Sequence, residues 1–469
     1  MNRKQHVRVL AGIAVVALVA ASCGSDSDSS TDATDAPVST VETTADTTPA
    51  DTTPADTTPA DTTPADTTPS DTTPADTTPA DTTPADTEAP EGKGGFLALS
   101  PPDGDPIIVG MVNTEGSPGL DFPEISTSAQ AAADFLNDHG GLGGRPIEME
   151  FCDANGSPET SQACAQELAG KGVELVMLGL DLFPGYDTFT ASNIPVTGVL
   201  PILPGDYTAN ALFLGGGNTT TTAAMAAFAK ENFGATTAGI VSADNAGANG
   251  TEADLKRALD AAGITYVSIK GGDNETDAGY QGLMRQATAD DPDVLFSLYA
   301  DAGCIGTIRG RAVMGIETPV ITTAICSSAE VTTQVGDDAV GWYFIGASTE
   351  ETGTPEAADL QAILQSLGFT NSTELGLGGL AVTGLLSLAT IANSIAAEGA
   401  DVTGASIYET LGASNGAVNW PDANPFSCGA ASAYPTICNF VFPIATWVAG
   451  SGVETVPGFE ALDTTPFLS

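Results

Sequence analysis

Histidine is almost absent from this sequence, which has two, and only His139 lies beyond the N-terminal leader. Imidazole is the usual proton carrier in catalysis and the usual ligand in catalytic zinc and non-haem iron sites. A Ser-His-Asp triad, a zinc site of two or three histidines and a facial-triad iron site are therefore excluded. Hydrolases that use only carboxylates remain.

Basic residues are also scarce, because 13 Lys and Arg stand against 60 Asp and Glu, a formal net charge of -47. No basic stripe is available to neutralise phosphate groups. This excludes nucleic acid and an anionic membrane surface as docking partners. Much of the acidity lies in an N-terminal tail, so it carries little information about a ligand.

The N-terminal apolar run is too short for a permanent membrane span. Arg3, Lys4 and Arg8 are followed by an apolar run over 9–21, well short of the ~20 residues that a bilayer requires, as in a cleaved export signal. The run ends in Ala-Ala-Ser-Cys, which resembles a bacterial lipobox and predicts lipidation of Cys23. Ala20 stands where Leu is usual, and an ordinary signal peptide with an incidental cysteine is the alternative. We expect an extracytoplasmic protein, lipid-anchored to the cell membrane.

Large apolar residues are nearly absent from 24–95, where Thr-Thr-Pro-Ala-Asp repeats between Asp46 and Asp86. Such a segment cannot bury a core, and its regular proline favours extended polyproline II. Simple spacing is a sufficient role, although O-linked sugar on the threonines stays open. The predicted divisions are a signal peptide at 1–22, a disordered tether at 23–103 and a folded domain at 104–469.

After Pro106, short β-branched runs alternate with Ala-rich segments of helical period, the pattern of parallel sheets with crossover helices. The strands expected are 107–112, 147–151, 173–178 and 194–199, then 237–242, 264–269, 294–298, 319–322 and 342–345. The helices expected are 124–138, 158–169, 252–262, 278–289, 305–314, 355–367 and 375–397. Two such series predict an α/β fold of two lobes. Lobe 1 is placed at about 106–220 and 347–437, and lobe 2 at about 221–346 and 438–469.

Without Cys23, six cysteines remain, and they fall as near neighbours along the chain. We expect three sequential disulfides, because each pair joins a strand end or loop to the next element: Cys152 with Cys164, Cys304 with Cys326, and Cys428 with Cys438. No CxxC motif occurs, and an oxidising compartment favours pairing over thiolate ligation. No metal site is predicted.

Four stretches resemble one family. They are IVGMV at 108–112, LNDHGGLGGRPIEMEFCD at 136–153, PDVLFSLY at 292–299 and GDDAVGWY at 336–343. They are similar to the type I periplasmic solute-binding proteins of the branched-chain amino-acid group. The resemblance implies two Rossmann-like lobes joined by three crossovers, closing over a small solute that is passed to the permease subunits of an ABC importer. It also implies a monomer that is not an enzyme and has no cofactor.

In open α/β sheets, ligands bind outside the carboxyl ends of the strands. In the family, the loops after strands three and four bind a carboxylate through hydroxyls and backbone N–H groups, and the second lobe binds the ammonium through an aromatic ring and an acid. Tyr299 matches that aromatic position, and Ser117 and Thr323 lie at strand ends.

This sequence departs from that pattern, because Leu-Asp-Leu-Phe-Pro-Gly at 180–185 replaces the usual Ser or Thr, and Thr323-Ala324 replaces the acid. An amino-acid zwitterion would lose partners at both ends, although Asp181 or Asp301 can replace the acid. Otherwise the pocket suits a less polar relative of a branched-chain amino acid. Its candidate walls are Phe122, Leu182, Phe183, Leu200 and Tyr299.

Two glycine-rich stretches are interpreted as turns rather than as functional motifs. Gly-Ala-Ser-Asn-Gly at 412–416 fits a nucleophile elbow, but no histidine follows Ser414, so we interpret it as a turn. Gly-Gly-Leu-Gly-Gly at 140–144 follows a helix and is interpreted as a helix-ending turn. A ligand sensor with the same fold and a hydrolase using Asp181 and Asp301 stay open as alternatives.

Overall fold

The computed structural model describes residues 95–117, 121–349, 353–421 and 423–468. The predicted signal peptide, Cys23 and the tether up to residue 94 lie outside the described residues. The side chain of Asp301 lies outside them as well.

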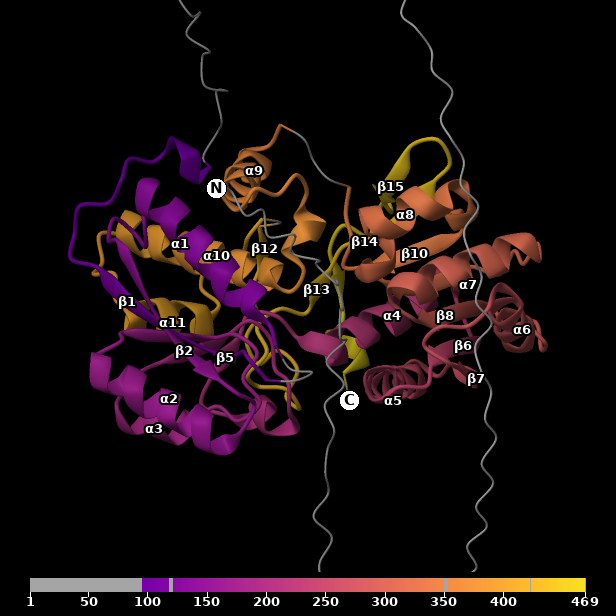
Figure 1. Cartoon of the computed structure of the whole chain (residues 1–469), viewed down its shortest axis with the longest axis horizontal. Helices are drawn as coiled ribbons and strands as arrows, with labels where there is room; N and C mark the ends of the chain where they lie inside the picture. Colours follow the sequence, from indigo (N-terminus) through magenta and orange to yellow (C-terminus); the bar gives the residue numbers. More distant parts are fainter. Residues whose placement is uncertain (1–94, 118–120, 350–352, 422, 469) are drawn as a thin grey trace, which may run out of the picture. The chain divides into compact units, whose positions relative to one another are not determined.

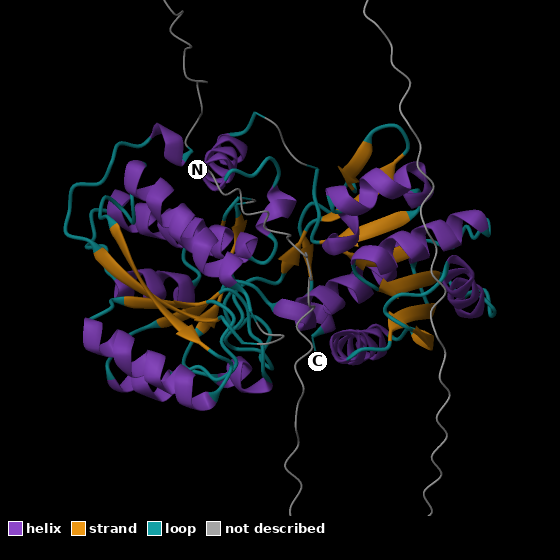
Figure 2. Cartoon of the chain, viewed as in Figure 1, coloured by secondary structure: helices purple, strands orange, loops and turns teal. Residues whose placement is uncertain are grey.

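The first sheet has five parallel strands in the order β2-β1-β3-β4-β5. Its strands are β1 (Ile107–Thr114), β2 (Ile147–Ala154), β3 (Leu175–Leu178), β4 (Val196–Gly198) and β5 (Leu212–Phe213). One face is covered by α1 (Pro123–Asp138), α9 (Pro355–Leu367), α10 (Gly378–Ala397) and α11 (Gly404–Ala413). The other is covered by α2 (Pro158–Lys171) and α3 (Tyr186–Ala191). We call this sheet with its helices the first lobe (Figures 1 and 2).

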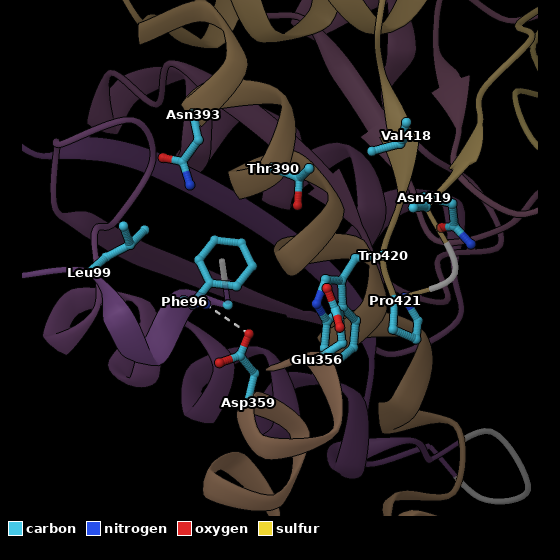
Figure 3. A pocket seen from close by; sticks show the side chains of 12 residues that line it. Phe96, Leu99, Glu356, Asp359, Thr390, Asn393, Val418, Asn419, Trp420 and Pro421 are labelled. Carbon is cyan, nitrogen blue, oxygen red and sulfur yellow. Dashed lines mark hydrogen bonds between the residues drawn. The ribbon is translucent and has the colours of Figure 1, made fainter. Parts of the chain in front are cut away.

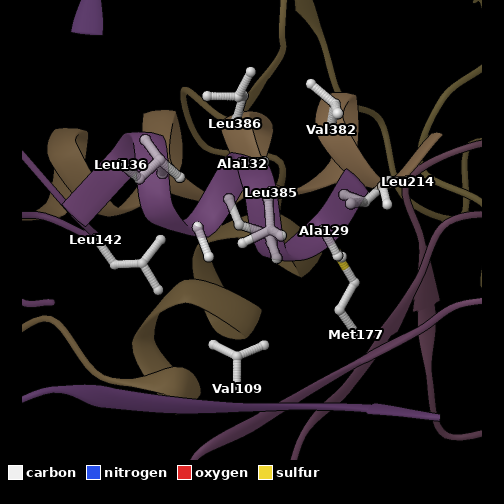
Figure 4. Packing of buried hydrophobic residues seen from close by; sticks show 14 of the residues in the cluster. Val109, Ala129, Ala132, Leu136, Leu142, Met177, Leu214, Val382, Leu385 and Leu386 are labelled. Atoms are coloured by element: carbon white, nitrogen blue, oxygen red, sulfur yellow. The ribbon is translucent and has the colours of Figure 1, made fainter. Parts of the chain in front are cut away.

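The core of the first lobe lies where α1 and α10 pack on each other and on the sheet. Figure 4 shows Ala129 and Ala132 of α1 beside Leu385 of α10, above Val109 of β1. The helices approach closely because Gly378 has no side chain. A Cβ there would lie 2.2 Å from the Ser128 hydroxyl. By length and composition α10 could cross a membrane, but here most of it is buried in this core.

The second sheet has seven strands in the order β15-β14-β10-β9-β8-β6-β7. Its parallel strands are β6 (Thr237–Ala243), β7 (Thr265–Gly271), β8 (Val294–Leu298), β9 (Val320–Thr323) and β10 (Trp342–Ile345). Its antiparallel edge is formed by β14 (Ile444–Val448) and β15 (Gly452–Thr455). One face is covered by α4 (Gly217–Phe233) and α5 (Ala246–Ala262). The other is covered by α6 (Asp277–Ala287), α7 (Asp301–Val313) and α8 (Ala329–Val335), and together these form the second lobe.

The chain passes between the lobes three times: after β5, after β10 and again through β13 (Val441–Phe442) before β14. The predicted fold class of two α/β lobes joined by three crossovers is confirmed. The helix α4 and the strands β14 and β15 were not predicted. Because α4 is buried nearly continuously from Thr219 to Ala229, its small residues show no one-sided helical pattern.

The folded domain begins earlier than residue 104. The 3-10 helix η1 (Phe96–Ala98) packs on the first lobe, with the Phe96 ring in the core. The Phe96 and Leu97 N–H groups donate to the two carboxylate oxygens of the buried Asp359 in α9, at 2.9 and 3.0 Å. The predicted end of the tether at 103 therefore lies after a turn that is already packed.

The disulfides follow the sequential pairing that the spacing predicts. Cys152 of β2 is joined to Cys164 of α2, and Cys304 of α7 to Cys326 in the turn after β9. The third bond joins Cys428 to Cys438, just before the last crossing between the lobes. Each bond links a strand end or loop to a neighbouring element.

Candidate functional site

Asn113 connects three segments at the carboxyl end of β1. Its amide nitrogen donates to the Phe122 carbonyl at 2.8 Å and to the Glu115 carboxylate at 3.0 Å. Its oxygen accepts the Leu180 N–H at 3.0 Å. Because Asn113 is buried, these bonds hold the end of β1, the start of α1 and the loop after β3 together.

Asp181 shapes the loop after β3 and is 2% exposed. Its Oδ1 accepts the Ser161 hydroxyl of α2 at 2.5 Å and the Phe183 N–H at 3.1 Å. The bond to the N–H two residues later forms an Asx turn, which directs the chain outward at Phe183. Burial raises the pKa of Asp181 above its usual range, and the charge of Asp206 adds to this effect. Its Oδ2 has no hydrogen-bond partner among the described residues.

Asp206 shapes the loop after β4 and is 4% exposed. Its Oδ2 accepts the N–H groups of Ile202 and Leu203 at 2.7 and 2.8 Å, and its Oδ1 accepts the Tyr186 hydroxyl at 2.7 Å. Burial, followed by the nearby Asp206 carboxylate, raises the pKa of Tyr186. The hydroxyl therefore stays protonated and remains a donor.

In the second lobe, Tyr299 directly follows β8 and lies in the core, 5% exposed. Its ring packs edge-on against Tyr280 of α6, with ring centres 5.7 Å apart. Burial raises the pKa of Tyr299, and its buried hydroxyl has no hydrogen-bond partner in the described structure. The ring thus serves the packing of its own lobe in this conformation.

The disulfide Cys304–Cys326 lies beside Tyr299 and joins the strand-end segments after β8 and β9. The two sulfur atoms lie 3.4 and 3.5 Å from the Tyr299 carbonyl oxygen. A disulfide has no thiol hydrogen, so these are packing contacts. Ile325, the residue before Cys326, extends into solvent with 43% of its surface exposed.

The predicted ligand residues differ in accessibility. Phe183 is 40% exposed, whereas Phe122 and Leu182 are buried, Phe122 in the first-lobe core. Three others, Ser117, Leu200 and Thr323, are partly exposed. Asp301 is the first residue of α7. The structure brings Asp181 and Phe183 into one turn.

Sequence reasoning did not identify Asn113, Ser161, Asp206 or Ile325. Asn113 lies next to the carboxyl end of β1 and Asp206 lies in the segment after β4, and these positions were the available signal. Most of their partners are backbone groups, such as the Phe122 carbonyl and the N–H groups of Leu180, Ile202 and Leu203, which leave no pattern in the sequence.

A cavity lies away from the predicted ligand residues, where η1 meets α9 and α10 (Figure 3). It has a volume of about 230 Å³, and Phe96, Asp359, Thr390 and Trp420 are among its walls. None of the predicted ligand residues lines it. A second, much smaller cavity of about 10 Å³ adjoins Asp254 and Tyr434 and does not include them either.

The described residues hold no group of three or more His, Cys, Asp and Glu side chains suited to a metal ion. Ser414 ends α11 in a left-handed conformation, with φ of 53°, and its hydroxyl accepts the Cys428 N–H at 2.9 Å. It occupies a turn, as interpreted from the sequence. The Asp181 carboxylate is buried in its own turn, which gives no support to a hydrolytic role.

Comparison with known proteins places the chain among binding proteins. A family described as periplasmic binding protein matches residues 106–423, while no curated protein matches the chain. The structure is similar to an ABC transporter substrate-binding protein from Sphaerobacter thermophilus, with a TM-score of 0.56, 19% identity and coverage of 76% of this chain and 100% of that one. A putative branched-chain amino acid ABC transporter from Rhodospirillum rubrum gives a TM-score of 0.58, 14% identity and coverage of 75% and 99%.

A third similar structure is a solute binding protein of an ABC transporter from Rhodopseudomonas palustris HaA2, in complex with p-hydroxybenzoic acid. It gives a TM-score of 0.53 and 17% identity, and covers 77% of this chain and 98% of that one. At identities of 14–19%, these similarities show a shared fold and nothing more specific.

Proposed function

We propose that this chain, which belongs to the periplasmic binding protein family, is the substrate-binding subunit of an ABC importer. It binds a small organic solute between its two lobes and delivers it to the permease subunits, acting as a monomer without catalysis. The family match supports the class of function. The strand-end loops support the location of the site.

The observation that carries this location is the exposure of Phe183 on an ordered loop. The aromatic ring stays 40% exposed although Asp181 fixes its loop. On the second lobe Ile325 is similarly exposed on a segment fixed by a disulfide. Large apolar side chains on rigid strand-end loops are typical of a ligand-binding surface.

The remaining predicted site residues belong to this proposal. Ser117, Leu200 and Thr323 are partly exposed at the strand ends. Phe122, Leu182 and Tyr299 are buried, so they would shape the walls from behind. Asp301 would reach the solute from the start of α7.

We also propose that the domain is held at the cell membrane by a lipid on Cys23, after removal of residues 1–22. The export signal and the lipobox-like sequence support this proposal. A diacyl anchor provides two buried chains, which suffice for stable attachment. Loss of detergent-phase partitioning in Cys23→Ala would support it, and unchanged partitioning would contradict it.

The function is tested by native mass spectrometry of the protein as purified, followed by calorimetry with the retained solute. Phe183→Ala should weaken binding about thirtyfold, because an aromatic anchor contributes upward of about 2 kcal/mol. Val313→Ala, which changes a 72% exposed residue at the end of α7, is the control and should leave affinity unchanged. If no solute is retained and none binds from a broad metabolite panel, the proposed function is wrong.

A further inference from the structure

Several backbone N–H groups of the first-lobe strand-end loops are already bonded to the chain's own side chains. Ile202 and Leu203 donate to Asp206 at 2.7 and 2.8 Å. Phe183 donates to Asp181 at 3.1 Å. Three donors that these loops could offer to a bound anion are therefore bonded to two internal carboxylates.

This arrangement has the geometry of an anion-binding site. Two consecutive N–H groups converge on one carboxylate oxygen of Asp206, as backbone nests do around bound anions. Asp206 is buried at 4% exposure, and the Tyr186 hydroxyl binds its other oxygen. A fourth N–H group of these loops, that of Leu180, is bonded to the Asn113 side chain.

These loops also lack the side chains that usually bind an anion. The loops at 179–185 and 199–203 contain no Ser, Thr, Lys, Arg or His, and Pro201 lacks an N–H. In the described first lobe the cationic side chains are Arg145, which pairs with Glu174 and bonds the carbonyls before β1, and Lys171, which pairs with Glu150 and Glu167. Neither side chain contacts these two loops.

We propose that the solute presents an uncharged, apolar face to the first lobe, and that a ligand carboxylate is excluded from it. The inference rests on the proposed function and narrows its ligand to a neutral organic compound. A carboxylate there would meet N–H groups that are already bonded to Asp181 and Asp206, and it would lie close to these two carboxyl groups, which is unfavourable on both counts. The apolar side chains of Leu200 and Phe183 provide the matching surface.

The first test uses probe pairs that share a carbon skeleton and differ in charge. Examples are p-hydroxybenzyl alcohol against p-hydroxybenzoic acid, and 4-methylpentanol against 4-methylpentanoic acid. Binding to the full chain, stripped of retained solute, is measured by calorimetry. The alcohol should bind at least tenfold more tightly than the acid in every pair that binds. Equal or tighter binding of the acids would overturn the inference while leaving solute binding intact.

The second test removes the Asp206 carboxylate, so that the N–H groups of Ile202 and Leu203 can bind another anion, and it includes a matched control. Asp206→Ala removes an acceptor of two consecutive N–H groups, and Asp359→Ala does the same at η1, away from these loops. Both variants should melt at lower temperature. Only Asp206→Ala should then shift the preference between acid and alcohol toward the acid, by at least tenfold. The same preference in both variants would overturn the inference.

Acetate gives a readout that needs no solute. It should raise the melting temperature of Asp206→Ala more than chloride does at equal ionic strength, and should leave Asp206→Asn unchanged because the amide oxygen still accepts the N–H groups. If Asp206→Ala does not fold, the preference is measured in Asp206→Asn, where it should shift toward the acid because the charge is gone. Absence of both effects contradicts the inference. Failure of every probe to bind the wild type, with no retained solute, contradicts the proposed function instead.

Discussion

The Leu180 N–H donates to the side chain of Asn113 at 3.0 Å, which joins the ends of two neighbouring strands through one buried amide. Backbone hydrogen bonds link the same two segments, because the Gly179 N–H donates to the Val112 carbonyl at 3.0 Å and the Thr114 N–H donates to the Leu180 carbonyl at 2.9 Å. The Asn113 side chain adds a further bond to this connection and fixes the start of the loop after β3.

Asn113→Ala should lower the free energy of unfolding by about 2–3 kcal/mol, because it leaves the buried Leu180 N–H without its partner and removes one of the two donors to the Phe122 carbonyl. Urea unfolding measures this loss. Asn137→Ala is the control, since Asn137 forms the same two kinds of bond with Ile147 at the start of β2, away from the carboxyl ends of the strands. Both variants should lose stability, but only Asn113→Ala should lose affinity for the retained solute.

Tyr299→Phe should leave stability unchanged or raise it by up to about 1 kcal/mol, because the buried hydroxyl it removes has no partner in the described residues. Tyr299→Ala should instead cost about 3–5 kcal/mol, since it empties a core position between α6 and α7. Thermal and urea unfolding of the two variants separates these effects. A large loss in Tyr299→Phe would show that the hydroxyl has a partner in solution.

The disulfide beside Tyr299 should act on local order more than on global stability. Removing it as Cys304→Ala with Cys326→Ala should cost about 3 kcal/mol by the chain-entropy argument. Hydrogen exchange should rise most at 299–304 and 323–328. The matched double variant at Cys152 and Cys164 should cost a similar amount and leave exchange in those segments unchanged. Uniform exchange changes in both variants would contradict a local role.

Because of Asp181, the free energy of unfolding should fall as the pH rises. Its pKa in the folded protein lies above the usual value because of burial, so the folded state binds the proton more tightly than the unfolded chain, where Asp titrates near 3.9. The stabilisation is therefore complete below the unfolded pKa and is lost as the pH rises through the folded pKa. Urea unfolding from pH 4 to 8 should show this loss in the wild type and a flatter profile in Asp181→Asn. Ser161→Ala should steepen the loss, since the Ser161 hydroxyl stabilises the ionised form.

Asp293 should show the opposite dependence. Its Oδ2 accepts the N–H and hydroxyl groups of Thr236 and Thr237, and these bonds lower its pKa to about 2. Its contribution is present above the unfolded pKa near 3.9 and is lost as the pH falls through about 2. Asp293→Asn should cost about 1 kcal/mol at pH 7, modest because the group is exposed, and nearly nothing at pH 2. An equal cost at both pH values would contradict this assignment.

The strands and helices of the two lobes could be predicted because most of them leave a recognisable pattern in the sequence. Helices buried on one face show a helical period of apolar residues, and buried strands appear as short apolar runs. The helix α4 was missed because it is buried almost all round, so its Thr and Ala residues give no periodic signal. Phe183 was proposed as a ligand residue from its position after β3, and the structure shows that its side chain is 40% exposed there. The partners of its loop could not be predicted, because the Ser161 to Asp181 bond joins residues whose proximity depends on how α2 packs beside β3.

The two hydrogen bonds between η1 and Asp359 also determine where a mechanical force on the N-terminal segment would enter the domain. The Phe96 and Leu97 N–H groups are bonded to Asp359, so a pull on the chain before Gly95 is transmitted to α9. The first lobe alone receives this force at its outer helix. Tension applied before Gly95 would therefore strain a pair of hydrogen bonds far along the chain from the candidate loops at 179–185 and 199–203.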